Sequence, residues 1–180
     1  MTASALTATA PYAARPRNAG FDIGPATRAI ITAAAIAMSA ACLFALMRFA
    51  LGLAPAHPAM RNIAVVLHVV TVLPAVPLGA YLLLSRKGTP RHRQLGKLWV
   101  GLMVVTALAI TFIRGGTDFS WIHIFVPLTL HGAWKTIVTA RAGKIAEHKR
   151  HLVGMYLGAL MIPGIFSFLP DRMMGTWLFG

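Results

Sequence analysis

Histidine is the residue type in this sequence with the most chemistry to offer. The chain has 180 residues, of which seven are histidine and only four are Asp or Glu. Imidazole binds metals, carries protons and forms hydrogen bonds near neutral pH. His57 lies in a Pro-containing connection, where we expect no functional role. The other six are the candidate site residues: His68, His92, His123, His131, His148 and His151.

Four of these histidines form two pairs when they are placed on the apolar segments of the chain. If each apolar segment crosses a membrane and the N-terminus is inside, His68 lies near the outer end of the second segment. His123 lies at the start of the fourth segment, which is also on the outer side. His92 and His148 lie at the inner ends of the third and fifth segments. Because a helix rises about 1.5 Å per residue, the members of each pair lie at similar depths. We therefore expect one pair of imidazoles at each membrane face.

Two histidine pairs on alternate helices of a four-helix bundle are the arrangement of a diheme b-type cytochrome, in which each iron takes two imidazoles. The sequence predicts one haem b between His68 and His123 and a second between His92 and His148. The predicted function is electron transfer through bis-histidine haem. A quinol is the expected redox partner, since the chain offers no soluble domain. No nucleophile–base pair, carboxylate pair or phosphate loop indicates other catalysis.

Two of the candidate ligands have an alternative close by. His131 follows His123 by eight residues and points about 80° away from it on a helix, so it is either a packed core histidine or a replacement ligand. His151 can replace His148 in the same way. A single interfacial histidine beside Arg and Lys is more often a head-group contact than a ligand, so the haem prediction depends on the joint pattern.

The elements that carry these histidines are five long apolar segments. Hydrophobic residues make up 57% of the chain and charged residues only 12%. A helix needs about 20 residues to cross the hydrocarbon core, and no segment alternates as a barrel strand does. We predict an all-α membrane protein whose helices 2 to 5 form a four-helix bundle, with the histidine-free first helix peripheral. The predicted spans are 29–52, 62–85, 94–113, 119–140 and 151–170.

The positive charge of the chain, +13, lies mainly in the connections between segments. Twelve Lys and Arg fall on one side and four on the other if the N-terminus is inside, which predicts an N-in, C-out arrangement. Membrane lipids, rather than nucleic acid, are the expected partners of these charges. Residues 1–26 read as a disordered cytoplasmic tail, and 27–180 as a single transmembrane domain. The expected haem-propionate or lipid contacts are Arg61, Arg91, Arg93, Lys97, Arg114 and Arg150.

No Asp or Glu falls within an apolar segment, which disfavours a proton pump or an ion-coupled transporter. Glycines at 79, 101, 154 and 158 are small residues past which a porphyrin edge can fit. A second hypothesis needs no cofactor. In it the chain is a haem-free structural or accessory membrane subunit whose basic inner rim holds anionic lipid or a partner.

Several motifs resemble those of an uncharacterised bacterial family of multi-span membrane proteins. Residues 91–99, RHRQLGKLW, resemble its HRxxGxxY segment, and 148–156 resemble its HRxWM segment, which precedes the last span. The likeness covers about residues 61–175. It departs at Lys149, where Arg is usual, and at His151, where Trp is usual, so His148 is the better candidate ligand. The resemblance implies a multi-pass protein of the bacterial inner membrane, with no established activity.

Overall fold

The computed structural model describes residues 23–113 and 121–180, and every regular element in this part of the chain is helical. The predicted all-α class is therefore confirmed. The elements are α1 (Pro25–Ala50), η1 (Pro58–Arg61), α2 (Ile63–Leu84), α3 (Pro90–Thr111), η2 (Trp121–Ile124), α4 (Phe125–Arg141), α5 (Ile145–Gly154), η3 (Met155–Met161), α6 (Ile162–Phe166) and α7 (Met173–Phe179). The segment η3 has π-helical geometry and joins α5 to α6 in one continuous helix.

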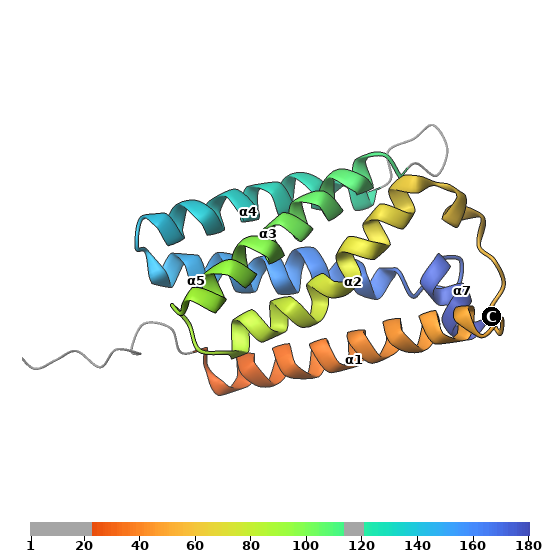
Figure 1. The fold of residues 1–180 in the computed structure, drawn as a ribbon, viewed down its shortest axis with the longest axis horizontal. Helices are drawn as coiled ribbons and strands as arrows, with labels where there is room; N and C mark the ends of the chain where they lie inside the picture. Colours follow the sequence, from red (N-terminus) through yellow and green to blue (C-terminus); the bar gives the residue numbers. More distant parts are fainter. Residues whose placement is uncertain (1–22, 114–120) are drawn as a thin grey trace, which may run out of the picture.

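Four helices close into a ring, and α1 lies outside it. In the ring α2 packs on α3, α3 on α4, α4 on α5 and η3, and η3 on α2 (Figure 1). The first helix contacts α2, η3 and α7. In this ring α2 lies diagonally opposite α4, and α3 lies diagonally opposite α5. The sequence prediction placed helices 2 to 5 in a four-helix bundle with the first helix peripheral; its five membrane spans and their topology stay predictions.

Local capping fixes where α2 and α3 begin. The side chain of Asn62 accepts a hydrogen bond from the backbone N–H of Ala64, and Thr89 accepts one from the N–H of His92. Such caps satisfy backbone donors that the first helical turn leaves open. Pro90 takes the first position of α3, where its missing N–H costs nothing. As a result His92 is held in the first turn of α3.

The helices differ from the predicted spans at several points. The last long helix begins at Ile145, six residues before the predicted start of the span, so both His148 and His151 lie inside it. The first helix begins at Pro25, within the predicted tail; the rest of that tail, 1–22, lies outside the described residues. A seventh helix, α7, was not predicted. Its Trp177 donates a hydrogen bond to the carbonyl of Pro55, and Arg48 of α1 donates to the carbonyl of Leu178.

The middle of the bundle is filled by two aromatic side chains. Trp99 of α3 and Tyr156 of η3 are both fully buried. The indole N–H of Trp99 donates to the carbonyl of Ala75 at 2.8 Å, and the Tyr156 hydroxyl donates to that of Val76 at 3.2 Å. Both acceptors lie in α2 between or beside its two prolines. The side-chain donors therefore stabilise the part of α2 where proline disturbs the backbone ladder.

Large apolar side chains cover the outside of the molecule. Ile36, Leu43, Ile63 and Phe112 each expose more than 60% of their surface. Among the described residues α1, α2 and α3 are long and apolar enough to cross a membrane. A continuous apolar exterior of this kind indicates contact with lipid or with another protein rather than with water.

Candidate functional site

His68 is fixed against the neighbouring helix α3. Its Nδ1 lies 3.3 Å from the backbone carbonyl oxygen of Thr106. Because a carbonyl only accepts, Nδ1 carries the proton, and in the neutral imidazole Nε2 then carries the lone pair. A second contact, at 2.7 Å, joins the hydroxyls of Thr71 and Thr106 beside it. The interface of α2 and α3 thus sets both the tautomer and the position of the His68 ring.

His148 is fixed in the same manner against α4. Its Nδ1 lies 2.9 Å from the backbone carbonyl oxygen of Thr136, so here too Nδ1 donates and Nε2 keeps the lone pair. This is the second-sphere hydrogen bond that orients metal-binding histidines in proteins, with a backbone carbonyl on one nitrogen and the metal on the other. The hydroxyl of Thr136 is buried and has no hydrogen-bond partner among the described residues.

The inner pair of histidines is brought together. His92 on α3 lies close enough to His148 on α5 and to Lys87 for their charges to act on its imidazole. Both rings are half-buried. The two imidazoles therefore come from diagonal helices of the ring, α3 and α5.

The outer pair consists of His68 and His123, which lie on separate elements, α2 and η2. His68 is joined to α3 through Thr106, while His123 is buried in η2, just before α4 begins. His68 thus belongs to α2, and His123 to the short helix that leads into α4, which is diagonally opposite α2 in the ring. Among the described residues no group of three or more His, Cys, Asp or Glu gathers as metal ligands. A bis-histidine haem needs only two protein ligands, since the porphyrin supplies the others.

Gly79 does not leave room for a porphyrin. A Cβ atom built there would lie 2.6 Å from Nε1 of Trp99 and 2.7 Å from the Tyr156 ring. The space beside this glycine is thus taken by protein. Along α3, Trp99 is seven residues from His92 and seven from Thr106, about 10 Å in each direction. The packed centre separates the two histidine ends, so any cofactor must lie at the ends.

The other candidate glycines have open surroundings. A Cβ at Gly101, Gly154 or Gly158 would meet nothing within 4 Å in the structure. The glycine pair at 154 and 158 therefore makes no close helix contact, although its spacing is typical of one. Gly154 also ends α5 where the π-helical segment begins. Wide turns of this type inside a helix are frequent at functional sites.

The two alternative ligands lie on the outer side of α4 and α5. His131 is exposed, with its ring 5.8 Å from that of Trp134, so it is not a packed core histidine. His151 is half-buried and lies within charge reach of His131 and Lys135. Neither position brings these rings to the interior of the ring of helices.

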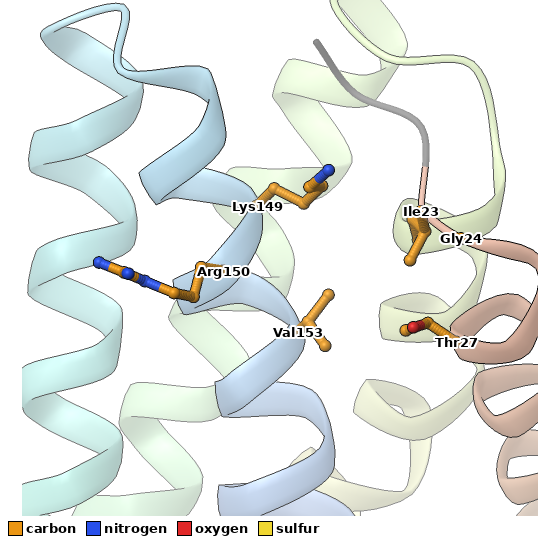
Figure 2. Close-up of a pocket in the computed structure, with 6 residues that line it drawn as sticks. All are labelled: Ile23, Gly24, Thr27, Lys149, Arg150 and Val153. Carbon is orange, nitrogen blue, oxygen red and sulfur yellow. The ribbon is translucent and has the colours of Figure 1, made fainter.

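The basic residues expected near propionates or lipid are surface residues. Arg61, Arg91, Arg93, Lys97 and Arg150 are all exposed, and Arg114 lies outside the described residues. Arg91 is held over the ring of Tyr81 at 5.8 Å. A cavity of about 250 Å³ separates α5 from the start of α1. Figure 2 shows Lys149 turned toward Ile23 across this cavity, while Arg150 extends the other way, toward α4.

Sequence reasoning missed the backbone carbonyls of Thr106 and Thr136, which orient His68 and His148. Five threonines within the apolar helices are buried: Thr71, Thr106, Thr129, Thr136 and Thr139. The residue types give no signal for these two bonds, because every residue carries a backbone carbonyl. Helix packing decides which carbonyl faces which ring.

Comparisons of the chain with protein-family models, with curated proteins and with solved structures gave no match. The resemblance to a bacterial membrane-protein family remains a prediction from the motifs.

Proposed function

We propose that this chain is a b-type cytochrome-like protein of the bacterial inner membrane that transfers electrons through bis-histidine haem. The inner site would use His92 and His148, and the outer site His68 and His123. The observation that carries the proposal is the pair of hydrogen bonds from Nδ1 of His148 and of His68 to helix carbonyls. Both bonds leave Nε2 with the lone pair that an iron ligand needs.

The proposal includes five membrane spans with the N-terminus inside. Besides α1, α2 and α3, helical structure continues over 121–141 through η2 and α4, and over 145–166 through α5, η3 and α6. Each of these two stretches is about 30 Å long, which matches the hydrocarbon core. The excess of Lys and Arg in the connections at one end supports that end as cytoplasmic.

The inner site has a donor set that suits haem. His148 offers a lone pair at Nε2, His92 lies near it on the diagonal helix, and the buried Thr136 hydroxyl lacks a partner among the described residues. Arg91, Arg93 and Lys97 supply positive charge at the same rim for carboxylate groups. Haem supplies one-electron chemistry when bound. His92 and His148 would hold the haem, the Thr136 carbonyl would fix the tautomer of His148, and a membrane quinol is the expected donor.

Counting haem per chain in histidine variants tests the proposal. The full chain is purified from haem-sufficient cells, and haem is measured by the pyridine haemochrome assay. We expect His92→Ala and His148→Ala each to lose about one haem per chain relative to wild type. His57→Asn is the matched control. His57 only caps η1, through Nδ1 and the N–H of Ala59, and Asn is also a good cap.

A fold check keeps this experiment decisive. Each variant is compared by gel filtration and far-ultraviolet circular dichroism, so that loss of haem is read only from folded protein. Equal haem content in folded wild type and folded His148→Ala would contradict the inner site.

One observation favours a second function. Gly79, Trp99 and Tyr156 pack the centre of the bundle without a cofactor, as in a haem-free structural or accessory subunit. In that case the basic rim would bind lipid or a partner protein. Folded wild-type protein without haem would favour this reading.

A further inference from the structure

The outward side of α4 and α5 carries a cationic patch that the proposed haem sites do not use. We define the α4/α5 patch as His131, Trp134, Lys135, Arg150 and His151. Trp134 is 55% exposed and lies between its neighbours, with its ring 5.8 Å from that of His131 and 4.9 Å from Nζ of Lys135. Lys135, His131 and Arg150 all lie within charge reach of His151. Two helices therefore contribute to one group of cations around an exposed indole.

The charges of this patch lie deep along α4, where a charge without an oppositely charged partner has a high free-energy cost. Lys135 precedes the end of α4 at Arg141 by six residues, about 9 Å along the axis, and His131 lies about 15 Å from that end. If α4 crosses the membrane, both residues lie within the helix rather than in a connection. Ionisable side chains at such positions are rare, and they mark functional sites when they occur.

Acidic groups do little to offset this charge. Among the described residues, Glu147 is the acid that acts on His151. Its carboxylate also lies 3.8 Å from Lys144, which is itself basic. Arg150 extends toward α4, away from the cavity at the start of α1 (Figure 2). Lys135 and Arg150 therefore add positive charge on the same side of the bundle.

We propose that the α4/α5 patch binds the headgroup phosphate of an anionic phospholipid of the inner leaflet. Lys135 and Arg150 supply charge-assisted hydrogen bonds to the phosphate, and both lie within charge reach of His151. The long stem of Lys135 lets its ammonium reach the headgroup level, and the exposed Trp134 ring suits the membrane interface. The patch faces sideways into the bilayer, so a lipid reaches it directly.

This inference rests on α4 crossing the membrane, which is part of the proposed function. It does not depend on haem. Absorbance at the Soret wavelength is measured on the same samples, so failure of lipid binding and failure of haem binding are separate results.

Quenching of tryptophan fluorescence by brominated lipid tests the proposal. The full chain is delipidated in detergent and titrated with dibromo-phosphatidylglycerol or with dibromo-phosphatidylcholine. We expect phosphatidylglycerol to quench at about tenfold lower concentration, as charge-assisted hydrogen bonds predict. The variant Trp134→Phe should lose this lipid-specific part of the quenching. Lys135→Gln and Arg150→Gln should each bring the two lipids to nearly the same concentration.

The matched control is Arg86→Gln, which removes an exposed basic residue from the connection after α2. It should keep the tenfold preference. Equal quenching by both lipids in wild type would overturn the proposal, as would an Arg86→Gln effect as large as that of Lys135→Gln. Soluble glycerol 3-phosphate is the third arm. Its displacement of the lipid at low millimolar concentration would show a water-borne phosphate ligand instead and would contradict the lipid source.

Discussion

The helix pairs α2/α3 and α4/α5 share one kind of hydrogen bond between a histidine ring and a backbone carbonyl, but the residues around that bond differ. In each pair one histidine donates from Nδ1 to a threonine carbonyl of the other helix, His68 to Thr106 and His148 to Thr136. The α2/α3 interface adds a hydroxyl pair and the Trp99 hydrogen bond to Ala75. The α4/α5 pair has an unpartnered Thr136 hydroxyl inside and exposed cations outside.

This difference separates two roles. The α2/α3 interface is closed by packing, so substitutions there should act on the stability of the fold. The α4/α5 interface combines a polar interior with a charged exterior, so substitutions there should act on ligand binding and little on stability. The following predictions test that division.

The largest effect is expected at the centre of the α2/α3 interface. Gly79→Ala would place a Cβ 2.6 Å from Trp99 and 2.7 Å from Tyr156, and both rings are fully buried. We expect a loss of about 3 kcal/mol, at the upper end of overpacking costs, measured by reversible unfolding in mixed detergent micelles. Gly101→Ala is the control because its Cβ meets nothing within 4 Å. A melting curve of Gly79→Ala that matches that of Gly101→Ala would refute the packed centre.

A smaller effect is expected from the hydroxyl pair beside His68. Thr106→Val removes the 2.7 Å contact with Thr71 and keeps the carbonyl that His68 uses. Hydrogen bonds between helices in membranes contribute about 0.6 kcal/mol, so we expect a loss of that size in the same unfolding assay.

The control for this variant is Thr129→Val. The Thr129 hydroxyl donates to Phe125 within its own helix, so its removal breaks no contact between helices. An equal loss in both variants would mean that the hydroxyl pair does not join α2 to α3.

The smallest effect is expected on the exposed rim of α5. Glu147→Gln breaks the 3.8 Å ion pair between Glu147 and Lys144. The side chain of Lys144 is 62% exposed and that of Glu147 is 47% exposed. Solvent screens such pairs, and we expect a change below about 0.5 kcal/mol. The same variant in high salt should show no difference from wild type. A loss above 1 kcal/mol would contradict the view that this rim contributes little to the fold.

Much of the fold was readable from the sequence because apolar length marks helices directly. The bundle of helices 2 to 5 and the peripheral first helix followed from the placement of histidines and charges. The last long helix begins six residues before the predicted span 151–170, because apolarity marks membrane depth rather than helix ends. Residues 145–150 are polar yet helical, and Lys144 gives no side-chain cap that could signal a start. The short helix α7 was missed for the opposite reason, since its apolar stretch is too short to span.

The site was readable only in part. The types and approximate depths of His92 and His148 predicted one haem site for this pair, and that assignment stays a prediction; the two histidines lie within charge reach of each other. The hydrogen bonds to Thr106 and Thr136 were not predictable, because helix rotation decides which carbonyl faces which ring. Gly79 was read as space for a porphyrin, whereas Trp99 and Tyr156 fill that space. Side-chain packing between distant segments decides such cases.

The most direct test of the central claim is the visible spectrum of the full chain purified from haem-sufficient cells. The account predicts a Soret band and, after reduction with dithionite, the sharp α band of a low-spin bis-histidine b-type haem. A protein with a helical far-ultraviolet spectrum, a single gel-filtration peak and no Soret band would contradict it.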